Sequence, residues 1–184
     1  METDERARVI QRLRAAVDRI ADAMDARLIP EVGTNIAYAL PDARDVEDVA
    51  AVRGRIVRLE KTAHPVGEIA FGASDHVARI VLTAMRFDRT IRSAANIRFS
   101  EAVLAELDNL MFAICSFDRT EEPPGLRTMD WGVASCCRDG VPDVIYDRGA
   151  VGKEAMIRIL GEDPGTVADN ILKLSARIRS AHLE

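Results

Sequence analysis

The sequence predicts an α/β domain with a mixed β-sheet that is covered by helices on both faces. Three observations favour this class. The 184 residues are 48% apolar and 30% charged, which is typical of a soluble globular protein with one substantial core. Strand and helix patterns alternate after a first helix, and their connections are too varied for a regular βαβ repeat. We expect about six or seven strands and about five helices.

The first element is a helix predicted at residues 4–26. One face of this segment is apolar at helical spacing and consists of Ile10, Leu13, Val17, Ile20 and Met24. This stripe lasts about two heptads, fewer than a coiled coil needs, so packing against its own domain is slightly favoured over a contact between copies of the chain. The opposite face mixes both signs of charge, and we therefore expect no contact with DNA.

Strand and helix patterns alternate through the middle of the chain. Pro30 ends a linker, and strands are predicted at residues 34–40, 55–59 and 66–71, with a short helical turn near 46–49. Ser74 is suited to cap a helix because its hydroxyl accepts hydrogen bonds from backbone N–H groups one turn later. Apolar residues at helical spacing then extend this helix to Arg86.

The second half of the chain continues this alternation. Strands are predicted at residues 95–99, 111–117, 144–146 and 155–160. Three helices lie among and after these strands, and their expected N-caps are Ser100, Thr128 and Asp163. The first of these helices covers residues 101–109, and Pro164 opens the last one.

The overall charge and the cysteines narrow the functional classes. The net charge of −5 and the pI near 5.3 provide no basic patch for nucleic acid. No apolar run is long enough to span a membrane. Cys115, Cys136 and Cys137 make no disulfide framework, which favours a reducing, cytoplasmic setting. Cys115 is expected to be buried and inert within an apolar strand.

Polar residues cluster where predicted strands end and helices begin. Common nucleotide-binding and hydrolase motifs are missing from the sequence, but several junctions pair a glycine with Arg or Lys. Glycine lets backbone N–H groups approach an anion and the cation adds charge, so this pattern indicates a phosphorylated small molecule. The alternative is that the junctions are tight turns with solvated charges. For the whole set of junctions, a ligand site and ordinary turns are about equally favoured. The candidate binding residues are Asn35, Gly72, Ser74, Asp75, Asn96, Arg98, Ser116, Asp118, Arg119 and Lys153.

The helix that begins after Ser74 is the most informative junction. Asp75 and His76 fall in its first turn, beside free backbone N–H groups of the kind that bind phosphate. We expect Lys153 or Arg119 to lie near this helix end and to add positive charge. His76 is suited to carry a proton or a hydrogen bond at neutral pH, although local chemistry alone favours an ordinary helix cap with a partly exposed histidine.

Short phrases of the sequence, taken in order, resemble the ThiN-type thiamine-phosphate synthase family. Two of them are Gly54-Arg55-Ile56-Val57 and Phe71–Ala78, and the others lie at 28–36, 96–100, 116–119, 129–132, 142–147, 152–154 and 156–161. Together they span residues 28–161 and continue into the last helix. The resemblance divides one compact domain into an N-terminal amphipathic helix at 1–27 and a family-like region at 28–184. The family is typical of archaea, often as the C-terminal half of a fusion with a hydroxymethylpyrimidine-phosphate kinase.

The resemblance implies a fold, an activity and a catalytic pair. The implied fold is a three-layer α/β/α arrangement with a mixed, mostly antiparallel sheet, as in class II aldolases (AraD-like). The implied activity is a transferase reaction of thiamine biosynthesis, which joins hydroxymethylpyrimidine diphosphate to thiazole phosphate and gives thiamine monophosphate and pyrophosphate. The family's catalytic arginine and histidine correspond to Arg55 and His76.

These residue types suit the implied chemistry. A planar arginine fork and helix N–H groups stabilise the charge that develops on a leaving diphosphate, and an imidazole hydrogen-bonds a phosphate or holds the substrate. The reaction needs no nucleophilic side chain and no organic cofactor. Mg²⁺ is expected to bridge the diphosphate, with Asp75 or Asp118 as water-mediated contacts, and no metal ligand is assigned.

A regulatory module is the alternative function. Some relatives carry an N-terminal helix-turn-helix and sense thiamine phosphates, and those domains tend to lack the catalytic pair. Here about 27 residues precede the family-like region, too few for that DNA-binding motif, and Arg55 and His76 are both present. The enzyme is therefore favoured, with small phosphorylated substrates as partners and a separate kinase as a further candidate. Association between copies of the chain stays open.

Overall fold

The computed structural model describes residues 2–181. Met1 and residues 182–184, at the outer ends of the predicted segments 1–27 and 28–184, lie outside the described residues. The helices are α1 (Glu2–Ala23), α2 (Asp75–Met85), α3 (Glu101–Asn109), α4 (Thr128–Cys136) and α5 (Pro164–Ser180), with 3-10 turns η1 (Ala26–Leu28), η2 (Val46–Asp48) and η3 (Arg119–Glu121). The strands are β1 (Ile36–Ala39), β2 (Val49–Val52), β3 (Ile56–Leu59), β4 (Thr62–Pro65), β5 (Ile69–Phe71), β6 (Ser93–Arg98), β7 (Ile114–Ser116), β8 (Val144–Asp147) and β9 (Met156–Gly161).

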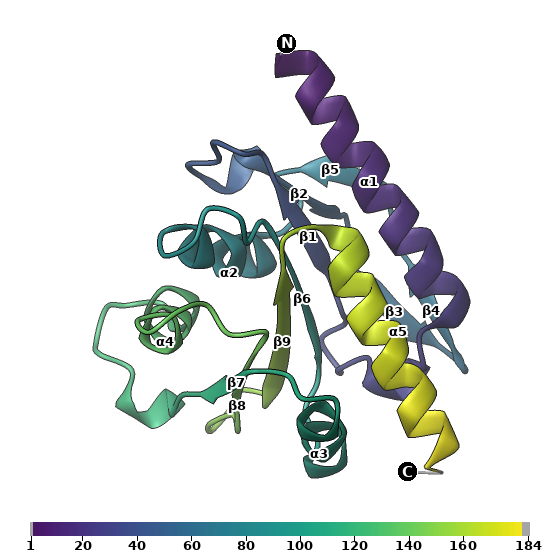
Figure 1. The fold of residues 1–184 in the computed structure, drawn as a ribbon, viewed down its shortest axis with the longest axis vertical. Helices are drawn as coiled ribbons and strands as arrows, with labels where there is room; N and C mark the ends of the chain where they lie inside the picture. The colour runs from purple at the N-terminus through teal and green to yellow at the C-terminus, as the bar shows by residue number, and fades with distance from the viewer. Residues whose placement is uncertain (1, 182–184) are drawn as a thin grey trace.

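The strands of residues 2–181 form one mixed sheet and one separate hairpin. The seven-stranded sheet has the order β5-β2-β1-β6-β9-β8-β7, and β3 pairs with β4 (Figure 1). Neighbouring strands of the large sheet run antiparallel, except that β7 and β8 are parallel. The predicted α/β class with a mixed, mostly antiparallel sheet is confirmed.

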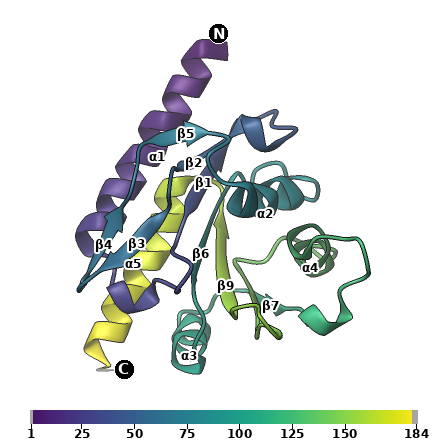
Figure 2. The same ribbon diagram turned by 180° about the vertical axis from the view of Figure 1, so that it is seen from behind.

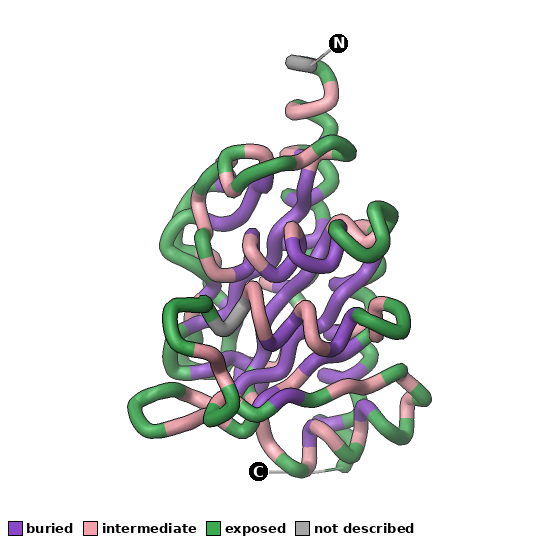
Figure 3. The backbone as a smooth tube through the Cα atoms, turned by 90° about the vertical axis from the view of Figure 1, so that its left-hand side faces the viewer, coloured by how far each residue is buried: buried purple, intermediate pink, exposed green. Residues whose placement is uncertain are grey.

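Helices cover both faces of the large sheet (Figure 1 and Figure 2). Helices α1 and α5 and the β3–β4 hairpin pack on one face, where Tyr38, Ile97 and Ile157 are buried. Helices α2 and α4 cover the other face over smaller side chains such as Ala37 and Ala94. Figure 3 shows buried backbone gathered in the middle of the molecule, with exposed and intermediate backbone mostly around it. Alternate residues of the central strands therefore point into two different cores.

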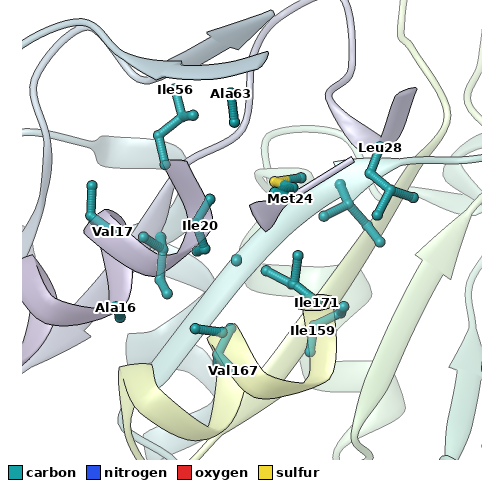
Figure 4. Packing of buried hydrophobic residues seen from close by; sticks show 14 of the residues in the cluster. Ala16, Val17, Ile20, Met24, Leu28, Ile56, Ala63, Ile159, Val167 and Ile171 are labelled. Carbon is teal, nitrogen blue, oxygen red and sulfur yellow. The ribbon is translucent and has the colours of Figure 1, made fainter. Parts of the chain in front are cut away.

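Helix α1 packs against its own domain, as the favoured interpretation of its apolar stripe predicts. Leu13 and Ile20 are fully buried, Val17 and Met24 are 4% exposed, and Ile10 lies at the half-buried edge. Figure 4 shows the stripe between the β3–β4 hairpin and α5. Burial of each such side chain contributes roughly 1.5–3 kcal/mol, so α1 is part of the core and not an appendage.

The structure contains two strands that the sequence pattern does not predict. Turn η2 lies where a helical turn is expected, but the chain then continues as the central strand β2, because a run of four apolar residues does not distinguish strand from helix. Strand β4 ends at Pro65 and pairs only with β3 among the described strands, which suits a proline because it cannot donate to a second neighbour.

Several predicted boundaries differ from those of the structure: the helix predicted at 4–26 ends at Ala23, the strand predicted at 66–71 begins at Ile69, and two further differences have a clear reason. Thr128 is the first residue of α4 and not its cap, since Arg127 occupies the N-cap position and its side chain makes no capping hydrogen bond. The strand predicted at 111–117 is limited to Ile114–Ser116. Met111 has a φ of 64°, in the left-handed region, so it lies outside any extended strand.

The expectation that the cysteines remain unpaired is also wrong. Cys115 on β7 and Cys136 on α4 form a disulfide bond across 21 positions of sequence, and Cys137 is free and buried. Cys115 is half-buried rather than fully enclosed. Packing of α4 beside β7 brings the two thiols together, and sequence spacing carries no sign of that contact.

No helix within residues 2–181 is long and apolar enough to cross a membrane.

Candidate active site

A cavity of about 240 Å³ lies between the first turn of α2 and the ends of several sheet strands. Its walls come from parts of the chain that are far apart in sequence, including the turn between β2 and β3 and the loop between β8 and β9. Seven of the predicted site residues line it, namely Asn35, Arg55, Ser74, His76, Asn96, Arg119 and Lys153. Folding therefore brings both residues of the predicted catalytic pair to one cavity.

The other predicted site residues do not line this cavity; they are Gly72, Asp75, Arg98, Ser116 and Asp118. Asp75 is exposed and forms ion pairs with Arg79 at 2.9 Å and Arg127 at 3.3 Å. Arg98 is exposed and lies beside Ser100 at a separate, smaller cavity. Ser116 and Asp118 line a further cavity next to the first one.

Gly72 and Asp118 have local structural roles. Gly72 has a φ of +69°, in the left-handed region that favours glycine, and a Cβ atom added there would also lie 2.6 Å from Oε2 of the Glu47 side chain. The carboxylate of Asp118 accepts hydrogen bonds from the backbone N–H and the hydroxyl of Thr120 and caps η3. These bonds hold the pKa of Asp118 below its usual value.

Arg55 occupies a strained position in the turn between β2 and β3. Its φ is 70° and that of the preceding Gly54 is 71°, and this left-handed conformation is unfavourable for a residue with a Cβ atom. Nη1 of Arg55 donates a hydrogen bond to the backbone oxygen of Val32, which holds the side chain against the cavity. Strained residues of this kind cluster at functional sites.

His76 lies in the first turn of α2, and Ser74 caps that helix with its hydroxyl. Burial and the positive charges of Arg158, Arg119 and Arg55 lower the pKa of His76 to about 4, so the imidazole is neutral near neutral pH. Nε2 is buried and has no hydrogen-bond partner among the described residues. A polar atom beside the cavity is thus left to interact with a ligand.

Sequence reasoning assigns no role to two buried residues next to His76, Asp147 and Arg158. Oδ2 of Asp147 lies 2.7 Å from Nη2 of Arg158, and both side chains are fully buried. Oδ1 lies 2.8 Å from Nε of Arg119, whose side chain is 8% exposed, although this contact lacks hydrogen-bond alignment. Because two guanidinium groups share one carboxylate, the cluster has a net positive charge that favours an anion nearby.

The strand pattern contains a signal for this cluster. Arg158 interrupts the apolar run of β9 between Ile157 and Ile159. When the apolar pattern of a strand predicts a buried position, a charged residue at that position needs a counter-charge. Asp147, at the end of the apolar strand β8, is the matching signal.

The amides of Asn35 and Asn96 hold the strand ends together at the cavity wall. Oδ1 of Asn35 accepts from the backbone N–H groups of Ile36 and Val52 at 2.9 and 3.0 Å. Oδ1 of Asn96 accepts from the backbone N–H of Asn35 at 2.7 Å, and its Nδ2 donates to the oxygen of Gly33 at 3.0 Å. Both amides therefore shape the cavity through the backbone.

The loop before β9 contributes a cation and a carboxylate. Nζ of Lys153 lies 3.2 Å from Oε2 of Glu122 and is close to half-exposed. Glu154, which sequence reasoning does not single out, accepts hydrogen bonds from the backbone N–H groups of Glu31 and Val32 at 3.0 and 3.4 Å. Glu154 thus ties this loop to the loop that precedes β1 across the cavity.

The cavity is not built as a protein metal centre. Within residues 2–181 no group of three or more His, Cys, Asp or Glu residues is placed to hold a metal ion. The carboxylate of Glu154 lines the cavity but already accepts two backbone hydrogen bonds. Asp75 and Asp118, the expected water-mediated contacts, do not line it. The residues present do not fit a resident metal ion.

The chain is similar to proteins of thiamine biosynthesis. The family described as thiamine-phosphate synthase ThiN matches residues 12–173. The chain is 36% identical over 179 residues to thiamine-phosphate synthase ThiN of Methanothermobacter thermautotrophicus, which covers 93% of this chain and 94% of that protein. It is 47% identical over 159 residues to the bifunctional thiamine biosynthesis protein ThiDN of Methanocaldococcus jannaschii. That match covers 85% of this chain but 38% of the relative, so the chain spans less than half of the ThiDN protein.

Solved structures show the same relationship. The crystal structure of a C-terminal domain of phosphomethylpyrimidine kinase is 42% identical and has a TM-score of 0.87, covering 92% of this chain and 100% of that chain. An aldolase II superfamily protein from Pseudomonas syringae has a TM-score of 0.54 at 10% identity, covering 97% and 77% of the two chains. The second likeness is one of fold alone.

Proposed function

The chain belongs to the thiamine-phosphate synthase ThiN family, and from this premise we propose that it joins hydroxymethylpyrimidine diphosphate to thiazole phosphate. The products are thiamine monophosphate and pyrophosphate. The observation that carries the proposal is the single cavity lined by Arg55, His76 and the first turn of α2. Cations and helix N–H groups meet there around a space for an anionic ligand.

The proposed reaction forms one C–N bond and breaks one C–O bond. The thiazole nitrogen gives its electron pair to the methylene carbon of the pyrimidine. The electron pair of the broken C–O bond leaves with pyrophosphate. The protein therefore has two tasks, which are to stabilise negative charge on the leaving group and to hold the two substrates in line.

We assign the diphosphate to the cations of this cavity, Arg55, Arg119 and Lys153. A guanidinium group binds two phosphate oxygens with two parallel hydrogen bonds, and Lys153 adds a point charge. The buried Asp147 lies against Arg119 from behind, so this charge is in place before the substrate arrives. Such preorganised charge stabilises a leaving group without the cost of reorienting solvent.

His76 acts in this proposal as a neutral hydrogen-bonding group. Three arginines and burial oppose a positive imidazole, so His76 does not supply charge to the leaving group. A neutral imidazole offers one donor and one acceptor nitrogen. Since Nε2 lacks a partner among residues 2–181, it is suited to orient the bound pyrimidine diphosphate.

Mg²⁺ enters the proposal only as an ion that accompanies the diphosphate and neutralises part of its charge. The carboxylates near the cavity are engaged elsewhere, so we assign no residue to the ion. No organic cofactor is part of the proposal.

The remaining expectations are also proposals. We propose that the fold is of the class II aldolase type, which the TM-score of 0.54 with an aldolase II superfamily protein supports. A hydroxymethylpyrimidine-phosphate kinase is the proposed source of the diphosphate, supported by the bifunctional relative. Because the substrates are phosphorylated metabolites, the proposed setting is the cytoplasm.

Incubation of the protein with both phosphorylated substrates and Mg²⁺ tests the function. Formation of thiamine monophosphate together with pyrophosphate supports the synthase. Binding of thiamine monophosphate without any turnover would instead support the regulatory module.

A further inference from the structure

A second cavity of about 240 Å³ lies beside the first, and Arg119 lines both. It opens where β7 and β8 end, and these strands are the parallel pair of the sheet. Ligands of α/β proteins commonly bind at the carboxyl ends of parallel strands. Ser116, Tyr146 and Arg148 contribute polar atoms to the lining, and the carboxylate of Asp118 is engaged by hydrogen bonds within η3.

The side chain of Arg119 lies between the two cavities and lines both. Its side chain is 8% exposed, and its Nε lies 2.8 Å from Oδ1 of Asp147. Asp147 is held in turn by Arg158 at 2.7 Å. Because one buried carboxylate faces two guanidinium groups, Arg119 keeps an uncompensated positive charge that is directed to both cavities.

The two cavities differ in positive charge. The first adds Arg55, Lys153 and the start of α2 to Arg119, whereas the second adds only Arg148. A diphosphate carries more negative charge than a phosphate monoester, so the first cavity suits the diphosphate and the second suits the monoester.

Aromatic rings hold the guanidinium group of Arg148 beside the second cavity. The guanidinium carbon of Arg148 lies 5.3 Å from the ring centre of Phe99 and 5.8 Å from that of Tyr146, and the two rings stack on each other. Arg148 also pairs with Glu101, but both side chains are more than half exposed. An exposed pair of this kind is weak, so Arg148 is able to exchange Glu101 for a phosphate.

We propose that the second cavity binds thiazole phosphate, with its phosphate group between Arg119 and Arg148. The heterocycle then lies toward the first cavity, where its nitrogen faces the methylene carbon of the pyrimidine. This inference rests on the function proposed above. It assigns the two anionic substrates to opposite sides of Arg119.

Steady-state kinetics of three variants test this assignment. Arg148→Ala is expected to raise the KM for thiazole phosphate at least about fivefold, because a charge-assisted hydrogen bond is lost, and to change the KM for the pyrimidine diphosphate less than about twofold. Lys153→Ala is expected to show the reverse pattern. Arg138→Ala is the matched control, because Arg138 is exposed and lines neither cavity. The assignment is overturned when Arg148→Ala leaves both KM values unchanged or raises that of the diphosphate as much.

Calorimetric titration of thiazole phosphate alone separates this inference from the proposed function. Weaker binding by Arg148→Ala than by the wild type supports the subsite even when no product is formed, and that result contradicts only the synthase. Product formation together with equal binding by the two proteins contradicts only the subsite. Circular dichroism melting of each variant confirms that the exposed substitution leaves the fold intact.

Discussion

Asp147 on β8 and Arg158 on β9 form a fully buried ion pair, with 2.7 Å between Oδ2 and Nη2. The two strands are antiparallel neighbours, and the pair crosses them diagonally, since Asp147 is paired in register with Met156. The second oxygen of Asp147 contacts Arg119. The pair therefore links the interior of the sheet to the residue that separates the two cavities.

Removal of the shared carboxylate is expected to destabilise the protein strongly. Asp147→Ala leaves two buried guanidinium groups without their counter-charge, which costs about 3–5 kcal/mol of unfolding free energy. Chemical denaturation measures the loss. Glu101→Ala is the control, because it removes the partner of an exposed arginine and is expected to cost less than about 1 kcal/mol. Similar small losses in both variants would show that the buried pair does not stabilise the fold.

The stability of the protein is expected to fall between about pH 7 and about pH 5 because of His76. Its pKa is lowered from 6.5 to about 4 in the folded chain. As the pH drops below 6.5, the unfolded chain takes up a proton at His76 and the folded chain does not. The unfolding free energy therefore falls by up to about 2 kcal/mol over this range.

Denaturation curves of the wild type and His76→Gln at the two pH values check this effect. The difference in stability loss between the two proteins gives the contribution of His76, because all other titratable groups are the same in both. A wild type that loses no more stability than His76→Gln would mean that His76 is protonated in the folded chain.

Both residues of the proposed catalytic pair are expected to matter for turnover. Arg55→Ala and His76→Ala should each lower kcat for thiamine monophosphate formation at least about tenfold, which corresponds to about 1.4 kcal/mol of barrier. Arg58→Ala, on the exposed part of β3, is the matched control and should keep wild-type activity. Wild-type turnover in folded Arg55→Ala and His76→Ala would remove both residues from the mechanism.

The disulfide between Cys115 and Cys136 predicts that the stability depends on redox conditions. The bond closes a loop across 21 positions of sequence that includes Arg119, and cross-links of this size stabilise by roughly 3 kcal/mol. A reductant is expected to lower the Tm of the wild type and of Cys137→Ser equally. Cys115→Ser should melt at the lower temperature with or without reductant. An identical Tm of the wild type in both conditions would contradict a stabilising bond.

Much of the helical framework can be predicted from the sequence, because N-cap residues and apolar spacing are local features of the chain. Ser74, Ser100 and Asp163 are the N-caps of α2, α3 and α5, as predicted from their hydroxyl and carboxylate side chains. The β2 strand is not predicted, because its pairing with β1 and β5 is a long-range contact that four apolar residues do not encode.

The candidate site is predicted in part for a related reason. A glycine beside a cation marks a junction, as at Arg55 and Lys153, and folding brings seven of the predicted site residues to one cavity. Whether a polar atom is left for a ligand depends on its neighbours in space. The side-chain amides of Asn35 and Asn96 form hydrogen bonds with the backbone, and Asp75 pairs with Arg79 and Arg127. The ion pair of Asp75 with Arg79 joins residues four positions apart on one helix, but the other contacts join residues that are far apart in the sequence.

The most direct test of the proposed function is the formation of thiamine monophosphate from hydroxymethylpyrimidine diphosphate and thiazole phosphate by the purified chain with Mg²⁺. Chromatography that detects thiamine monophosphate, with a parallel assay of pyrophosphate, should show equal amounts of both products from the wild type. Arg55→Ala and His76→Ala should form them at least about tenfold more slowly. The absence of thiamine monophosphate in the wild-type reaction, at substrate concentrations that calorimetry shows to saturate both cavities, would contradict the synthase.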